Sequence, residues 1–312
     1  MKHLATPVLA LLLAASLNAQ EANRPAILGI GQVALWSGGY QTTDYPEAFA
    51  FYRQLKFVDL GAYQTGAPVH QSYALNAHQS ILLTIAPRLA SSGSSHLDDI
   101  LFETSDLAAM RAYLVQKGIK VTELYNWDIQ GKSVSGEASF FTMNDPDGHV
   151  IGFMQYTTPI PFHPAEGQLS SHLIHAGFIV RDQVAMDHFY KDILGFRPYW
   201  HGGMKDNETS WISLQVPDGS DWVEFMVNLP PNPDQRLSGI MNHIALGVPD
   251  IHEAGKQLLK NGMKLTEEPK IGRDGKWQLN LYDPDQTRVE LMEFTPVEKP
   301  CCSEYTGPHP KP

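Results

Sequence analysis

The stretch that decides the fold begins as NHIALGV (residues 242–248) and ends as DPDQTRVELMEF (283–294). Successive side chains of a β-strand point to opposite faces of the sheet, so the first segment places His243 on the face opposite Ile244. The last segment likewise places Glu290 opposite apolar neighbours. Each segment can therefore bury an apolar face under a helix while its polar side chain points away from the packed layer.

The same pair of segments occurs earlier in the chain, as LIHAGFIV with His175 and as WVEFMV with Glu224. The histidine precedes the glutamate by 49 positions in the earlier pair (224 − 175) and by 47 in the later pair (290 − 243). A histidine strand and a glutamate strand thus recur together. Self-similarity at a nearly fixed spacing indicates an internal repeat.

The rest of the chain divides into units of the same kind, each with one strand, one helix and about three strands. Predicted helices occupy residues 44–57, 106–118, 182–195 and 250–262. An aspartate stands at the start of each helix, and a glycine ends the last three, which are typical residues for the two ends of a helix. The segment MKLTEE (263–268) is predicted to be a strand of the last unit.

A unit of this form cannot bury its own core, so the units are expected to pair and to curl their sheets into cups. The predicted fold class is α+β, with four βαβββ repeats paired into two domains, each a cup-shaped mixed sheet with helices outside. The first domain covers residues 28–156 and the second covers 172–296. A Pro-rich linker, residues 157–171, separates them.

These repeats, with the phrases HAGFIVRD, HFYKDILGF, NHIALGVPD and LYDPDQTRVELMEF, resemble the vicinal oxygen chelate superfamily. That superfamily includes glyoxalases, bleomycin-resistance proteins, extradiol dioxygenases and fosfomycin-resistance enzymes, and the resemblance covers residues 28–296. In it, the first and last strands of each paired unit hold a divalent metal ion. The resemblance therefore implies one metal ion bound by His175, Glu224, His243 and Glu290. Imidazole and carboxylate ligands suit Zn, Ni, Co, Mn or Fe.

The resemblance also implies an enzyme that chelates a small molecule through two vicinal oxygens and uses the metal as a Lewis acid. In a glyoxalase-like isomerase or lyase, one ligand carboxylate, Glu224 or Glu290, would act as the catalytic base. An extradiol ring-cleaving dioxygenase using Fe(II) is the alternative, because such enzymes hold iron by two histidines and one glutamate, matching His175, His243 and Glu290. A non-catalytic binding protein of the bleomycin-resistance type is a second alternative, against which the full ligand set argues.

Two departures from the dioxygenase pattern favour the isomerase or lyase. Glu224 would be a surplus ligand at an iron site that needs open positions for oxygen. Dioxygenases of this family also carry a catalytic tyrosine four residues before the turn proline, where this chain has Asn280. Gln278 and Tyr282 share one strand face with Asn280 and are expected to line the cup. His201, in the aromatic stretch YWHGG, is a further candidate for supporting the metal ligands.

The first half of the chain serves as an internal control. Aligning the repeats puts Gln32 and Asp99 at the histidine positions, and Leu82 and Gly152 at the glutamate positions. Leucine and glycine offer no side-chain ligand, so the first domain is expected to lack the metal site.

The chain begins with MKHLATPVLALLLAASLNAQ, in which Lys2, an apolar run and a small-residue cleavage site predict a secretory signal peptide, residues 1–19. We therefore expect a secreted or periplasmic protein that is not held in the membrane after cleavage. Lys and Arg number 23 against 34 Asp and Glu, a formal net charge of −11. An acidic protein repels nucleic acid and anionic membrane surfaces, so the expected partner is a small-molecule substrate.

The only two cysteines, Cys301 and Cys302, are adjacent in a Pro-rich tail, residues 297–312. Adjacent cysteines cannot link distant elements, so the fold is not expected to depend on disulfides. A vicinal disulfide, an intermolecular bond and a free pair remain open.

Overall fold

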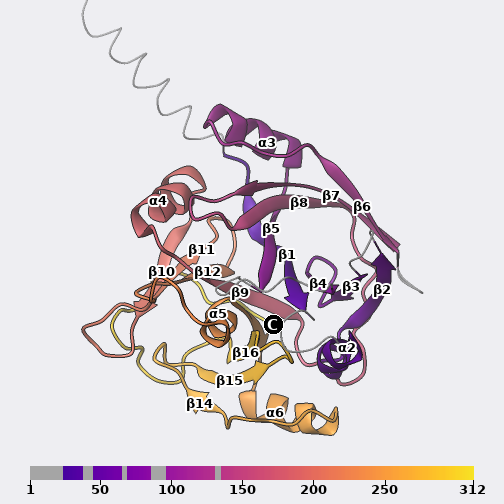
Figure 1. The fold of residues 1–312 in the computed structure, drawn as a ribbon, viewed down its shortest axis with the longest axis vertical. Helices are drawn as coiled ribbons and strands as arrows, with labels where there is room; N and C mark the ends of the chain where they lie inside the picture. The colour runs from indigo at the N-terminus through magenta and orange to yellow at the C-terminus, as the bar shows by residue number, and fades with distance from the viewer. Residues whose placement is uncertain (1–23, 38–44, 65–68, 86–95, 131–134) are drawn as a thin grey trace, which may run out of the picture.

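The structure, a computed structural model, describes residues 24–37, 45–64, 69–85, 96–130 and 135–312. The predicted signal peptide and Asp44 lie outside the described residues. Two mixed sheets of eight strands form the framework of the described chain (Figure 1). The first sheet has the order β2-β3-β4-β1-β5-β8-β7-β6. Its strands are β1 (Ile27–Ser37), β2 (Val58–Gln64), β3 (Val69–Ala74), β4 (Ser80–Ile85), β5 (Leu97–Thr104), β6 (Tyr125–Gln130), β7 (Ser135–Asn144) and β8 (Val150–Thr158).

The second sheet repeats this arrangement with every strand number raised by eight, in the order β10-β11-β12-β9-β13-β16-β15-β14. Its strands are β9 (His172–Ile179), β10 (Arg197–Gly202), β11 (Trp211–Gln215), β12 (Trp222–Met226), β13 (His243–Val248), β14 (Lys270–Ile271), β15 (Trp277–Tyr282) and β16 (Arg288–Glu293). Between the sheets, residues 159–171 contain neither helix nor strand.

The pairing register shows that the two sheets are copies of one design. β1 lies parallel to β4 with Gln32 opposite Ser80, just as β9 lies parallel to β12 with His175 opposite Trp222. In each sheet the two repeats meet at an antiparallel pair of first strands, β1 with β5 and β9 with β13. The predicted α+β fold of four βαβββ repeats in two domains is confirmed.

One helix belongs to each repeat: α2 (Tyr45–Gln54), α3 (Leu107–Gln116), α4 (Gln183–Asp187) continued by a π-helical turn η1 (His188–Ile193), and α6 (Ile251–Lys260). Asp106 caps α3 by accepting a hydrogen bond from Ala109 N at 2.9 Å, and Gly118, with φ of 81°, follows it. Capping side chains and left-handed glycines fix helix ends where the sequence predicts them. No helix in the described ranges is long and apolar enough to cross a membrane.

Two local predictions differ from the structure. The segment MKLTEE (263–268) is not a strand; instead, Glu267 accepts hydrogen bonds from Asn280 Nδ2 at 3.0 Å and from Tyr282 OH at 2.7 Å. This side-chain pairing holds the segment against β15 without a backbone ladder. A short helix that the sequence does not predict, α5 (Gln235–Met241), precedes β13, and Asp234 caps it by accepting from Leu237 N at 2.7 Å.

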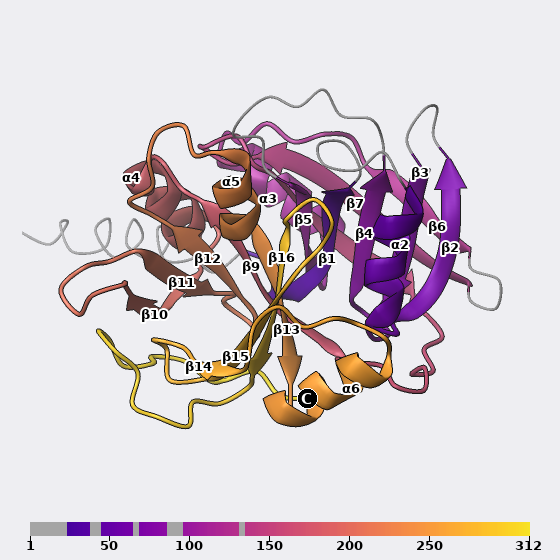
Figure 2. The same cartoon turned by 60° about the horizontal axis from the view of Figure 1, so that its bottom comes forward.

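The helical sides of the two domains pack against each other and share one hydrophobic core. Helix α6 lies beside α2 (Figure 2), where Asn261 Nδ2 donates to Gln54 O at 2.8 Å. Tyr113 of α3 donates to the carbonyl of Ile193 in η1 at 2.7 Å. Because each sheet turns its helical face toward the partner domain, its opposite face is free to form a cup.

Candidate metal centre

Four neighbouring strands supply the predicted metal ligands, one each. His175 lies on β9, Glu224 on β12, His243 on β13 and Glu290 on β16, and the order β12-β9-β13-β16 puts these strands side by side at the centre of the sheet. Gly177 lies opposite His243 in the β9–β13 pair. A Cβ atom at Gly177 would fall 2.0 Å from Cε1 of His243, so only glycine leaves room for this imidazole.

The structure brings all four side chains to one point. The Nε2 atoms of His175 and His243 are 3.1 Å apart. Oε2 of Glu290 lies 3.7 Å from His175 Nε2 and 3.6 Å from His243 Nε2. Oε2 of Glu224 is 3.7 Å from His243 Nε2. Glu290 therefore approaches both imidazoles, and Glu224 approaches that of His243 about as closely from a different strand.

Burial sets the protonation of these groups. It lowers the pKa of His175 and of His243 well below its usual value, and the nearby guanidinium of Arg288 lowers both further. Burial also raises the pKa of Glu224 to about 8, with repulsion from Glu290 as the second cause. Burial likewise raises the pKa of Glu290. Neutral imidazoles offer lone pairs, and two crowded carboxylates favour a compensating cation.

The donor set fits a divalent metal ion. His175, Glu224 and His243 each offer one ligand atom, and these atoms all lie within 4.8 Å of one another. Glu290 adds a second carboxylate oxygen beside both imidazoles. Two nitrogen and two oxygen donors suit the borderline metals from Mn to Zn. His175, Glu224 and His243 thus form a possible site for one divalent metal ion, with Glu290 next to it.

Arg288 is a member of the site to which the sequence analysis gives no role. Its Nη2 group donates to Nε2 of His243 at 2.6 Å and lies 3.8 Å from Oε2 of Glu290. The guanidinium therefore places a positive charge next to two of the predicted metal ligands. The sequence contained one signal for this position of Arg288. Arg288 and Glu290 are two residues apart on β16, so strand alternation puts both side chains on one face of the sheet.

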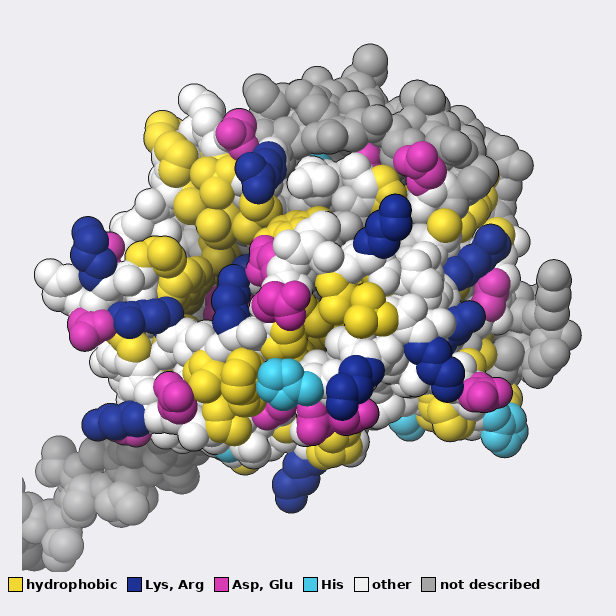
Figure 3. Space-filling view, turned by 90° about the horizontal axis from the view of Figure 1, so that it is seen from below, with side chains coloured by type: hydrophobic (Ala, Val, Ile, Leu, Met, Phe, Trp, Pro, Cys, Tyr) yellow, Lys and Arg dark blue, Asp and Glu magenta, His cyan; other side chains and the backbone are white. Residues whose placement is uncertain are grey.

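A cavity of about 340 Å³ opens onto the two carboxylates. Its apolar walls include Tyr199, Trp200, Trp211, Trp222 and Tyr305. Figure 3 shows the face of the molecule on which hydrophobic, basic and acidic side chains surround a hollow. The two imidazoles have no solvent exposure and are not among the lining residues, whereas both carboxylates line the cavity. A ligand entering the cavity meets the carboxylates first.

Of the four residues predicted to surround the ligands, two line the cavity and two do not. Gln278 and Asn280 line the cavity, and Asn280 lies directly opposite Glu290 in the β15–β16 pair. Tyr282 is not among the lining residues of this cavity, because its hydroxyl turns to Glu267. His201 is exposed and does not line the cavity either.

A buried lysine, Lys276, lies beside the cavity, and the sequence alone did not predict a role for it. Lys276 is fully buried, and its Nζ has no hydrogen-bond partner among the described residues. It lies 4.7 Å from the ring centroid of Trp222, 5.2 Å from that of Tyr305 and 5.7 Å from that of Tyr199. Burial lowers its pKa to about 8. These three rings form a cage around the ammonium group of Lys276. They come from three segments that are far apart in the chain, so no local sequence pattern predicts the cage.

The first domain presents a different set of side chains at the equivalent positions. Asp99 lies opposite Ala34 in the β1–β5 pair, as His243 lies opposite Gly177 in β9–β13. Gly152 on β8 takes the place of a carboxylate, and a Cβ atom there would fall 2.2 Å from Phe141 O. Within the described part of the chain, groups of side chains able to bind a metal occur in the second half alone.

Comparisons with known proteins agree with this architecture. Residues 172–291 match the sequence model of a family described as the Glyoxalase/Bleomycin resistance protein/Dioxygenase superfamily. No curated protein matches the chain.

Solved structures with a similar fold include a variant of homoprotocatechuate 2,3-dioxygenase from B. fuscum in complex with HPCA. It shares 18% identity at a TM-score of 0.60, over 87% of this chain and 72% of that one. The 2,3-dioxygenase LapB from Pseudomonas sp. KL28 shares 17% identity at a TM-score of 0.59, over 92% of this chain and 95% of that one. At these identities the likeness establishes a common fold.

Proposed function

Residues 172–291 belong to the glyoxalase/bleomycin resistance protein/dioxygenase superfamily, and from this premise we propose that the protein is a metal-dependent enzyme that chelates a small molecule through two vicinal oxygens. Its proposed reaction is an isomerisation or elimination of the glyoxalase type. Such a reaction moves a proton next to the chelated oxygens and needs no oxidant.

One observation carries this choice. Glu224 Oε2 and Glu290 Oε2 lie 3.7 Å and 3.6 Å from His243 Nε2, so four donors converge instead of three. With four protein donors, a bound divalent ion would have room for the two oxygens of a chelating ligand and for little else. Dioxygen would then have no position of its own.

The residues of the cavity have separate roles in the proposed reaction. A bound divalent ion would supply Lewis acidity to the two ligand oxygens. Glu224 is the proposed base, because its side chain is 13% exposed, whereas that of Glu290 is 5% exposed. Trp211 and Trp222 provide apolar walls that exclude water around the transferred proton.

An extradiol-type dioxygenase that uses Fe(II) is the second candidate. The observation in its favour is the short approach of His175, His243 and Glu290, which are the residue types of a facial triad with open positions. The solved structures with a similar fold named above are also dioxygenases. In this candidate Glu224 stands away from the metal.

The test compares Glu224→Gln with the unchanged protein on a panel of hydroxycarbonyl, diol and catechol compounds. Each protein is loaded with Zn, Ni, Mn or Fe(II) and assayed with and without oxygen. The proposed reaction requires turnover without oxygen and with Zn or Ni. The Gln variant should lose turnover by about 10²- to 10⁴-fold, the usual contribution of a general base, and should bind metal more weakly.

Turnover restricted to Fe(II) and oxygen, with the Gln variant largely active, would replace the isomerase or lyase by the dioxygenase. Binding of the panel compounds without turnover under any condition would instead support a binding protein. Metal content is measured on every sample by elemental analysis, so loss of the ion is not mistaken for loss of the base.

The proposed place of action is outside the cytoplasm, because residues 1–19 have the composition of a secretory signal. Amino-terminal sequencing of the protein recovered from its native cells tests this. A mature chain that begins near Gln20 is expected, and an intact amino terminus would contradict export by this route.

A further inference from the structure

The C-terminal tail, residues 297–312, joins the two edges of the second sheet. The tail contains neither helix nor strand. It starts at the turn between β14 and β15, where Cys301 N donates to Arg273 O at 2.8 Å. It then reaches β10 at the opposite edge, where Thr306 N donates to Tyr199 O at 3.0 Å. Because β14 and β10 are the outermost strands, the tail closes the open side of the cup.

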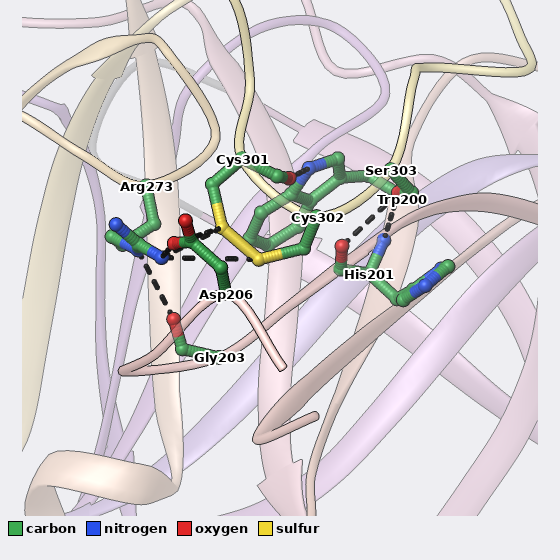
Figure 4. The surroundings of a disulfide bond; sticks show 8 residues. All are labelled: Trp200, His201, Gly203, Asp206, Arg273, Cys301, Cys302 and Ser303. Carbon is green, nitrogen blue, oxygen red and sulfur yellow. Dashed lines mark hydrogen bonds and ion pairs between the residues drawn. A yellow bond between two sulfur atoms is a disulfide. The ribbon is translucent and has the colours of Figure 1, made fainter. Parts of the chain in front are cut away.

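The start of the tail contains a vicinal disulfide between Cys301 and Cys302 and lies at the edge of the cavity (Figure 4). Arg273, which lines the cavity, donates from Nη2 to Cys301 Sγ at 2.8 Å and also pairs with Asp206. Trp200, another lining residue, donates from Nε1 to Cys301 O at 3.2 Å. Two cavity walls therefore hold the same turn of the tail.

Tyr305 is the tail residue that enters the cavity. Its hydroxyl donates to Asp274 O at 3.0 Å and to Asp274 Oδ2 at 3.1 Å. Its ring lies 4.8 Å from that of Tyr199 and 5.2 Å from Nζ of Lys276. A buried ammonium without hydrogen bonds depends on such ring faces for stabilisation. Tyr305 is thus held by three different partners in one orientation.

We propose that Tyr305 is a specificity-determining residue, whose ring limits the size of the ligands that reach Glu224 and Glu290. This proposal rests on the proposed function, since it takes the cavity to be the substrate site. A wall of this kind favours a compact planar diol or hydroxycarbonyl over one with a second ring. The tail lies outside the segment that matches the superfamily model, residues 172–291.

The experiment compares Tyr305→Ala, Tyr305→Phe and Glu304→Ala in the full-length, zinc-loaded protein without oxygen. Glu304 is the matched control, because it is exposed, adjacent in the tail and not among the lining residues. Dissociation constants are measured for catechol and for 2,3-dihydroxybiphenyl. Metal content and acrylamide quenching of tryptophan fluorescence are measured in parallel. Quenching is informative because three of the six tryptophans line the cavity.

Tyr305→Ala should shift the ratio of the two dissociation constants by about tenfold toward the larger diol, as expected for loss of one aromatic contact and its bulk. Its quenching constant should rise about twofold, and its zinc content should stay at the wild-type level. Tyr305→Phe keeps the ring, so it should behave as the unchanged protein does, as should Glu304→Ala.

An unchanged ratio together with unchanged quenching in Tyr305→Ala would overturn the proposal. If neither diol binds the zinc-loaded wild type, the proposed function fails, and the quenching comparison by itself decides whether Tyr305 covers the cavity. Circular dichroism checks folding. Tyr305→Leu, which keeps apolar bulk but not the ring, replaces the alanine variant if that variant does not fold, with the same two outcomes.

Discussion

The two domains share one strand order but not one set of side chains, and the comparison separates what the fold needs from what the site needs. In the second domain, His175 and the three other predicted ligands lie close together on one face of the sheet. In the first domain the corresponding strand position on β1 holds Gln32, and Gly152 is packed against the backbone of Phe141. Both domains bury the helical faces of their sheets in one shared hydrophobic core. The concave face is therefore free to gain or lose a site.

The largest expected effect is the difference in metal binding between two variants. One removes a predicted ligand from the second domain, and the other removes its counterpart from the first. His175→Ala should abolish stoichiometric metal binding and turnover, because a ligand at the centre of the donor set is lost. Gln32→Ala should leave the metal content unchanged. The metal also stabilises the folded state by mass action, so the apparent melting temperature of the wild type should rise with added zinc, whereas that of His175→Ala should not. Elemental analysis and thermal unfolding check both. A halved metal content in Gln32→Ala would mean that the first domain also binds an ion.

Asp99, the counterpart of His243, should lower the stability of the first domain at neutral pH. Burial raises its pKa to about 7. Its Oδ1 has no hydrogen-bond partner among the described residues. A buried carboxyl whose pKa is raised in the folded state does not reduce the free energy of unfolding at a pH below its unfolded-state pKa. As the pH rises through the folded-state pKa, the free energy of unfolding falls, because the charged form is unfavourable in the folded protein.

Asp99→Asn should therefore be more stable than the wild type by about 2 kcal/mol at pH 8, given about 1.4 kcal/mol per pKa unit and the partial exposure of the side chain. Near pH 4 the two proteins should be equally stable. Urea unfolding at both pH values measures this, with Glu123→Gln, at an exposed carboxylate, as the control. A constant difference at both pH values would assign the effect to packing and not to ionisation.

Arg288 should weaken metal binding in the second domain, because its guanidinium lies among the ligands, 2.6 Å from His243 Nε2. Arg288→Met keeps much of the side-chain bulk and removes the charge. The zinc dissociation constant should fall about tenfold, since repulsion between the two cations at a partly solvated site amounts to about 1 to 2 kcal/mol. Competition with a chromogenic chelator measures it. Lys270→Met, at the lysine of the cavity lining, is the control. Weaker zinc binding in Arg288→Met would show that the guanidinium supports the ligands.

The smallest expected effects come from two matched contacts between the domains. Tyr52 of α2 donates to Asp283 Oδ2 at 3.1 Å, and Tyr190 of η1 donates to Asp145 Oδ2 at 3.3 Å. Tyr52→Phe and Tyr190→Phe should each reduce the free energy of unfolding by about 1 to 2 kcal/mol, since each leaves a buried carboxylate with one hydrogen bond fewer. Chemical denaturation checks this. Similar losses would show that both domains contribute equally to the interface, and metal content should not change in either variant.

The sequence by itself determined the repeat and the fold class, and it predicted the four side chains that the structure brings close together. These features depend on strand alternation and helix caps, which act between residues close in the chain. His243 and Glu290 could be singled out because each stands as a polar residue on the open face of an apolar strand, and the repeat pairs them with His175 and Glu224. The same local rules failed at MKLTEE (263–268), where the side chain of Glu267 pairs with β15 instead.

Only the tertiary structure decided how the cavity is closed and charged. The cage around Lys276 takes its rings from β10, β12 and the tail, which are distant in sequence. The approach of Arg288 to His243 and the position of Tyr305 likewise depend on contacts across the sheet. Such contacts follow from how the sheet curls and where the tail crosses it. A periodic pattern shows which face of a strand a side chain occupies. The distance between side chains from different segments depends on how the whole domain packs.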